Sequence, residues 1–185
     1  MKKFWYILII IVIVVAGYWF FTRSSEPKAD VVGQSETNDS KPEVTNLTYD
    51  VDGDIFTLKN GTAEKESLPG SVIMDSLTIL GDTAYGDLDG DGDTDAAVWL
   101  LNDPGGTGKF HYAALVINNR GTFEPTNTIF LGDRIEPKKL AIQAEIASYS
   151  FLARKDDDPM TAEPTVAKSV RINYDKIKNR ISIKK

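Results

Sequence analysis

Five aspartates alternate with other residues in the stretch GDLDGDGDTD, which runs from Gly86 to Asp95. Written as D-x-D-x-D-G-x-x-D, the stretch offers carboxylates at positions 1, 3, 5, 7 and 9 and a glycine at position 6. Calcium takes six to eight oxygen ligands, and this spacing lets a tightly coiled loop present several carboxylates from one side. The glycine permits the sharp turn, and position 7 then contributes its backbone carbonyl. The stretch predicts a calcium site whose ligands are Asp87, Asp89, Asp91, Asp93 and Asp95.

The flanks of this loop favour strands over helices. Position 12 is Val98, where a helix-loop-helix calcium site needs a bidentate glutamate, and the following residues AAVWLL are apolar. The loop resembles the calcium loop of FG-GAP-type repeats, in which the same pattern joins two strands. That resemblance implies that Asp87, Asp89, Asp91 and Asp95 supply side chains and Asp93 its carbonyl. Such repeats usually occur in multiples and this chain has one copy, so the resemblance concerns only the ion site. An Asp/Gly-rich surface turn without an ion is the alternative.

Other residues that could take part in catalysis lack a defining sequence motif. The stretch LGDRIEP offers Asp133, Arg134 and Glu136, and ARKDDDPM offers Asp156–Asp158. Paired carboxylates can hydrolyse glycosides at the right separation, but turn residues and surface ion pairs explain both stretches more simply. We expect Asp133 and Arg134 to form a pair that fixes local conformation. His111 is the single histidine and no nucleophile-elbow sequence accompanies it, so we expect a structural histidine and no catalytic residue.

Composition narrows the class of partner. The chain has 185 residues, a formal net charge of −6 and no cysteine. The lack of cysteine excludes disulfides, thiolate zinc sites and a thiol nucleophile. Of the 21 basic residues, Lys2, Lys3 and Arg23 precede Glu26, so the body that follows is more acidic still. Since phosphate binding needs clustered Lys and Arg, we expect no nucleic-acid partner.

Residues 1–21 have the pattern of a membrane anchor. A basic start, residues 1–3, precedes an uncharged run of 18 residues from Phe4 to Phe21. As a helix this run is about 27 Å long, close to the roughly 30 Å of a bilayer's hydrocarbon core. Aromatic residues stand at both ends, as at membrane interfaces. A cleaved signal sequence is the alternative, but no small-x-small cleavage site follows. We expect a single transmembrane helix over 4–21, with the start in the cytoplasm and the remainder outside.

The rest of the chain divides into a stalk and a β-domain. Residues 22–46 are polar and lack aromatic residues, which predicts a flexible stalk. Over 47–185, short apolar runs alternate with turn signals such as Asn60-Gly61 and Gly81-Asp82. No stretch of a dozen residues there keeps a helical repeat. The pattern predicts an all-β fold, an antiparallel sandwich or barrel, with a short helix over 137–147 as the alternative for that segment.

Four stretches together resemble an uncharacterised family of small bacterial membrane-anchored or envelope proteins. They are YGDLDGDGDTDAAVWL, DPGGTGKFHYAAL, LGDRIEP and DDPMTAEPT. The resemblance covers most of the chain from Tyr49 onward. It implies a bacterial protein with an N-terminal membrane segment or signal and one extracytoplasmic, β-rich domain, and it implies no activity. Together with the predicted anchor, it leads us to expect a single-pass protein of the bacterial cell membrane.

These features favour a membrane-tethered, calcium-binding module without enzymatic activity, whose partner is an envelope protein or polymer. One alternative is a hydrolase of envelope glycans or peptides that acts through carboxylates such as Asp133 and Glu136. Another is a sensor of external calcium.

Overall fold

Antiparallel strands make up almost all of the regular structure. The computed structural model describes residues 41–159 and 161–184, which lie within one unit, Thr37–Lys185. The predicted anchor over 4–21 and residues 22–40 of the predicted stalk lie outside the described residues. Within the described residues, no helix is long and apolar enough to cross a membrane.

The strands are short, apart from four of nine to thirteen residues. In chain order the elements are a 3-10 turn η1 (Val44–Asn46) and the strands β1 (Thr48–Val51), β2 (Asp54–Thr57), β3 (Thr62–Glu66), β4 (Met74–Gly86), β5 (Asp95–Asp103), β6 (Phe110–Asn119), β7 (Thr122–Pro125), β8 (Ile129–Asp133), β9 (Glu136–Gln143), β10 (Ile146–Ala153), β11 (Val166–Asp175) and β12 (Arg180–Ile183).

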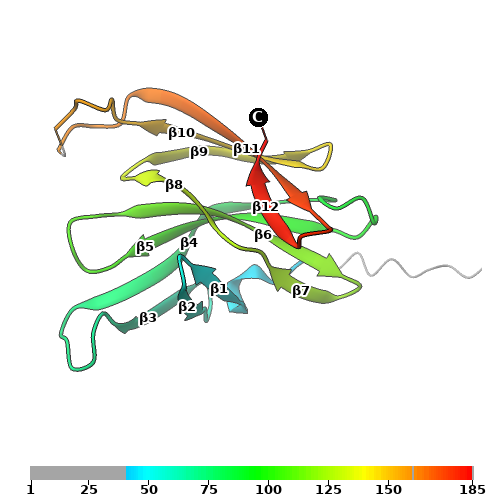
Figure 1. Cartoon of the computed structure of the whole chain (residues 1–185), viewed down its shortest axis with the longest axis horizontal. Coiled ribbons are helices and arrows are strands. Elements are labelled where there is room, and N and C mark those ends of the chain that lie inside the picture. Colours follow the sequence, from blue (N-terminus) through cyan, green and yellow to red (C-terminus); the bar gives the residue numbers. More distant parts are fainter. Residues whose placement is uncertain (1–40, 160, 185) are drawn as a thin grey trace, which may run out of the picture. The chain divides into compact units, whose positions relative to one another are not determined.

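Three sheets form from these strands (Figure 1). The central sheet has the order β3-β4-β5-β6-β7, with β8 also paired to β6. A four-stranded sheet has the order β12-β11-β10-β9, and β1 and β2 form a separate hairpin. Each pairing within these sheets is antiparallel. The prediction of an all-β domain built from antiparallel sheets is therefore confirmed.

The alternative of a short helix over 137–147 is wrong. These residues form most of β9, a tight turn at Ala144 and Glu145, and the start of β10. Leu140 and Ile142 both pack against the core between the sheets. They lie two residues apart, which is the repeat of a strand and not of a helix.

The predicted turn at Gly81-Asp82 is a local irregularity within one long strand. β4 runs through it, and its register with β5 shifts between Leu80 and Ala84. Gly81 has a positive φ of 62°, a conformation that costs little for glycine because it has no Cβ. The irregularity lets β4 keep its pairing with β5 on both sides of the glycine.

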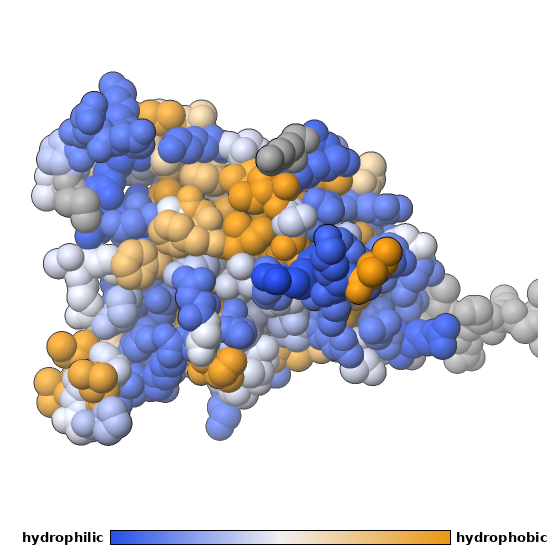
Figure 2. Space-filling model, viewed as in Figure 1, coloured by the Kyte–Doolittle hydropathy of each residue, from blue (hydrophilic) through white to orange (hydrophobic). Residues whose placement is uncertain are grey.

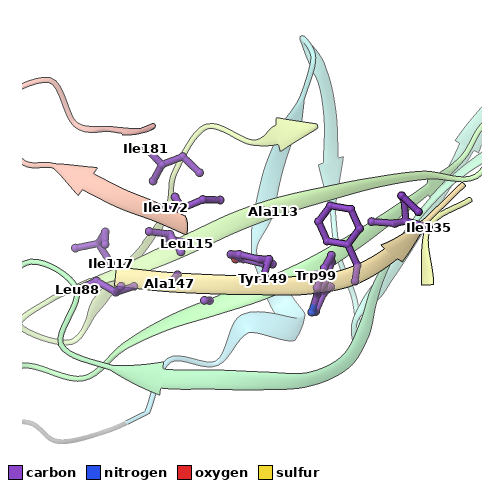
Figure 3. Packing of buried hydrophobic residues seen from close by; sticks show 13 residues of the cluster. Leu88, Trp99, Ala113, Leu115, Ile117, Ile135, Ala147, Tyr149, Ile172 and Ile181 are labelled. Carbon is purple, nitrogen blue, oxygen red and sulfur yellow. The ribbon is translucent and has the colours of Figure 1, made fainter. Parts of the chain in front are cut away.

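The main core lies between the central sheet and the four-stranded sheet. Alternate residues of β5, Ala97 and Trp99, share this core with Tyr149 and Phe151 of β10. Figure 3 shows Trp99 and Tyr149 within it. The rings of Trp99 and Tyr149 meet edge to face with centroids 4.9 Å apart, a favoured geometry for aromatic pairs. The Tyr149 hydroxyl donates to the carbonyls of Val98 (3.1 Å) and Ala114 (2.9 Å). This buried contact ties the second sheet to two adjacent strands of the first.

The opposite face of the central sheet is buried as well. The other alternate residues of β5, such as Val98 and Leu100, pack against the β1–β2 hairpin and against Val44 of η1. Val44 is 3% exposed, so the packed domain includes residues that precede the predicted boundary at residue 47. Burial of both faces explains why β5 and β6 are continuous apolar runs in the sequence.

Candidate metal-binding site

The aspartate loop connects β4 to β5. Gly86 and Asp95 pair across the two strands, so the loop is closed at its base by the sheet itself. Gly90 and Gly92 both adopt positive φ, 74° and 92°, which glycine reaches without a steric penalty. The sequence thus supplies glycine at the two positions where the loop reverses direction.

Aspartate side chains coil this loop by accepting hydrogen bonds from its own backbone. The Asp87 carboxylate accepts the N–H groups of Asp89 (3.2 Å), Gly90 (2.6 Å) and Gly92 (3.1 Å). Further along, Asp91 donates its N–H to Asp89 (3.1 Å). Such bonds from Asp to an amide two or three residues later are the usual chemistry of aspartate turns. They wrap the backbone around a set of inward-facing oxygens.

Three of the five predicted ligands come together. One carboxylate oxygen from each of Asp87, Asp89 and Asp95 lies within 4.8 Å of the other two. Two oxygens that ligate one calcium at 2.3–2.6 Å are at most about 5 Å apart, so this separation suits a single ion. Asp91 and Asp93 do not belong to this group of three. The Asp93 carboxylate instead accepts the N–H of Arg120 at 3.3 Å, which leaves its carbonyl as the group for a ligand role.

Asp95 is the most buried member of the group. Its side chain is fully enclosed, with no exposed surface. One carboxylate oxygen accepts the N–H of Leu88 at 2.6 Å and the other that of Asn118 at 2.8 Å. Burial raises the pKa of Asp95 to about 6, against the lowering effect of these two bonds and with a smaller contribution from neighbouring carboxylates. Its charge is therefore costly in this environment unless a cation lies close by.

The charged form of Asp89 is also disfavoured by its surroundings. Burial raises its pKa, and the negative charge of Asp91 adds to the effect. The Asp91 N–H lowers this pKa by bonding to the Asp89 carboxylate, and the Lys176 ammonium, which lies 3.4 Å from that carboxylate, lowers it further. The Asp89 side chain is 10% exposed while that of Lys176 is 50% exposed. A half-exposed lysine compensates weakly for a carboxylate that is mostly shielded from water.

Three turns from other parts of the chain meet the loop, and sequence reasoning missed all three contacts. The end of β6 and the turn after it contribute the amides of Asn118 and Arg120, and the β11–β12 turn contributes Lys176. The β9–β10 turn brings Glu145 so close that a Cβ on Gly90 would lie 3.0 Å from its carboxylate. The sequence NNRG predicts the β6–β7 turn, but no local signal indicates what that turn packs against.

Asp133 and Glu136, two of the other acidic candidates, have structural partners. Asp133 accepts the N–H of Lys109 at 2.8 Å and lies 3.6 Å from Arg134, which agrees with the expected conformation-fixing pair. The Arg134 side chain in turn donates to the carbonyl of Thr107. Glu136 pairs with Lys138, its neighbour two residues along β9. These contacts hold the β5–β6 loop against the end of β8.

A shallow hollow of about 280 Å³ does bring some of these groups together. Its lining includes Asp133, Arg154, Asp156 and Asp158, but not Glu136. Asp133 there is also 3.5 Å from Arg154, so the hollow carries both signs of charge.

His111 is 5% exposed and its Nδ1 lies 3.1 Å from the Lys109 carbonyl. Burial lowers its pKa, which favours the neutral form of a packed histidine.

No known protein family, curated protein or solved structure matched this chain. The fold and the acidic loop therefore carry the functional argument by themselves. They define a β-domain with one candidate cation site at the end of its central sheet.

Proposed function

We propose that this protein is a membrane-tethered component of the bacterial envelope whose extracytoplasmic β-sandwich domain binds one calcium ion. The domain acts as a non-enzymatic binding module toward an envelope protein or polymer. The anchor is the apolar run over residues 4–21, and the ion site is the loop over residues 87–95.

The convergence of Asp87, Asp89 and Asp95 carries the calcium part of this proposal. Carboxylates that are close together and shielded from water repel each other and resist ionisation. A dication at their centre turns this repulsion into attraction, because bound metal ions are often the largest local charges in a site. In the proposed site Asp91, which lies outside this group of three, would add a fourth carboxylate, and the Asp93 carbonyl would add a neutral oxygen.

Calcium suits this donor set better than other common cations. Every group offered is an oxygen, and the chain has no cysteine and only one histidine, which lies in β6 away from the loop. Oxygen-only sites favour calcium, magnesium and manganese over zinc and copper. Magnesium demands near-ideal octahedral geometry and gives up its waters reluctantly, whereas calcium accepts an irregular shell of carboxylates and carbonyls.

The ion would act mainly as a structural brace. Asp95 bonds at the same time to the loop, through Leu88, and to the end of β6, through Asn118. A cation held by Asp95 and by Asp87 and Asp89 of the loop would therefore fix the loop relative to two central strands. This would stiffen one end of the domain and present its turns to a partner in a defined arrangement.

Thermal unfolding of the unit Thr37–Lys185 tests the calcium site. We expect the melting temperature to rise with calcium, because a ligand of the folded state stabilises it by mass action. At a calcium concentration 100-fold above Kd the gain is about 2.7 kcal/mol. Magnesium at the same concentration should give a smaller shift.

Two double variants separate the site from a general effect of charge. Asp89→Ala with Asp91→Ala should abolish the shift, because both predicted ligands are lost. Asp156→Ala with Asp157→Ala removes the same number of charges from the β10–β11 loop and should leave the shift intact. A wild-type unit that shows neither a shift at millimolar calcium nor a heat of binding in calorimetry would contradict the proposal. The binding partner is a separate question, and affinity capture of the full chain from native membranes would identify it.

A further inference from the structure

The end of the β3–β4 hairpin exposes an unusual set of apolar side chains. We call the residues Ser67–Met74 the apolar tip; its sequence SLPGSVIM has no charge. Leu68 and Val72 are 71% and 97% exposed, and Ile73 and Met74 are 49% and 41% exposed. Figure 2 shows apolar surface gathered at this end of the hairpin. Single exposed apolar residues are ordinary, but four together on one projecting turn indicate a contact surface.

The backbone of the apolar tip is largely satisfied by acceptors of its own hairpin. Gly70 donates its N–H to the Glu66 carboxylate at 2.7 Å, and Ser71 donates to the Leu68 carbonyl at 2.9 Å. Ser67 and Ile73 also donate within the tip, to the Ile73 carbonyl and the Ser71 hydroxyl, and Pro69 has no N–H. An apolar medium penalises unpaired backbone donors. A turn that pairs its own donors can leave water at a low cost.

Lysines on the segments beside the tip are paired, and the acid that precedes it, Glu66, accepts the Gly70 N–H. The β5–β6 loop lies against it, since a Cβ on Gly105 would clash with Ile73, and its residues 104–108 carry no charge. Lys109, which follows that loop, pairs with Asp103, and Lys65 on β3 lies 2.7 Å from Asp54. The local surface is therefore apolar at its centre without an excess of positive charge around it.

From these observations we infer that the apolar tip inserts into the interfacial region of a lipid bilayer. The inference rests on the proposed membrane anchor, which makes the bilayer the apolar phase that is always within reach. The 20 steps from Phe21 to Lys41 can span at most about 70 Å. Lys41 lies at the other end of β4, over the ring of Tyr85 at 5.0 Å, and the 13 residues of β4 are about 43 Å long. The chain is thus long enough for the tip to touch the membrane that holds the anchor.

Tethering also explains why a small apolar surface is enough for membrane contact. A second contact made by an already anchored domain is intramolecular, so its effective concentration is high even if its intrinsic affinity is weak. The absence of unpaired lysines at the tip points to apolar insertion and not to attraction by anionic headgroups.

The chain has no cysteine, so a single introduced cysteine can carry an environment-sensitive dye. The full chain would be reconstituted into phosphatidylcholine liposomes as Val72→Cys or as Ile177→Cys. Ile177 is 96% exposed and apolar, like Val72, but it lies on the β11–β12 turn. We expect the dye at position 72 to shift to shorter wavelength, to resist quenching by iodide and to be quenched by nitroxide lipids. The dye at position 177 should behave as in water.

Each outcome bears on the inference. Adding Leu68→Asp to the Val72→Cys chain should restore iodide quenching, because a charge at the tip opposes insertion. If the chain floats with the liposomes while both dyes report water, the inference is overturned but the proposed anchor is supported. If the chain does not float, the proposed anchor is refuted, and the inference that rests on it is refuted as well. Protection of position 72 in native membranes but not in pure lipid would also overturn it, in favour of a protein partner.

Discussion

Gly86 sits where the aspartate loop leaves β4, and the four-stranded sheet packs directly onto it. A Cβ at this position would lie 2.8 Å from Cγ2 of Ile142 on β9. Ordinary carbon contacts begin near 3.5 Å, so Gly86→Ala has to push the two sheets apart locally. The φ of Gly86 is outside the left-handed region, so alanine fits the backbone and the steric contact is the cause of any loss.

The expected cost follows from this overlap. Inserting a methyl group into a packed contact typically costs about 1–3 kcal/mol, and replacing glycine in a strand returns about 0.5–1 kcal/mol through the unfolded state. We therefore expect Gly86→Ala to lower the free energy of unfolding by about 1 kcal/mol, and by no more than about 2.5 kcal/mol. Gly106→Ala is the matched control, because a Cβ there meets no atom within 4 Å, and it should change stability little.

A double-mutant cycle with Ile142→Ala tests the contact itself. Removing Cγ2 of Ile142 makes room for the new methyl group, so Gly86→Ala should cost less than about 0.5 kcal/mol in that background. Urea unfolding of Thr37–Lys185 can be followed by the fluorescence of Trp99, which is buried and is the only tryptophan in this unit. Additive losses, with no coupling between positions 86 and 142, would refute the packing argument.

Two further predictions concern buried polar groups. Tyr149→Phe removes the hydroxyl that bridges the Val98 and Ala114 carbonyls and should cost about 1 kcal/mol in urea unfolding, whereas Tyr174→Phe, whose hydroxyl bonds Asn179 at the surface, should cost little; equal losses would count against the buried bridge. Burial lowers the pKa of His111, so its contribution to stability is present above the unfolded pKa of 6.5 and is lost as the pH falls through its lower folded pKa. The wild-type unit should therefore lose more stability between pH 7.5 and pH 5 than His111→Gln, and parallel pH profiles would contradict this assignment.

Much of the β-domain follows from local sequence. Asn60-Gly61 predicts a hairpin turn, and both residues adopt the positive φ that this turn requires, 55° and 84°. The apolar runs that became β5 and β6 are long, rich in β-formers and bounded by turn residues, which makes their assignment secure. Gly81-Asp82 misled because a glycine within a strand and a glycine in a turn share the same sequence signal. The segment 137–147 was open between helix and strand because a short apolar run fits both repeats until its partners are known.

The candidate site, too, has features that local sequence predicts and features that depend on the tertiary structure. The spacing of Asp87 and Asp89 determines that their side chains leave a coiled loop on one side, because neighbouring residues position them through the local backbone. Only the tertiary structure decided that Asp95 is fully buried, that the amides of Asn118 and Arg120 dock onto the loop, and that Lys176 faces Asp89. It also decided that the apolar tip stays uncovered while equally apolar runs are enclosed. These outcomes depend on which strands, distant in the chain, pair and stack, and that choice is made by the burial of the whole core and not by any residue together with its neighbours.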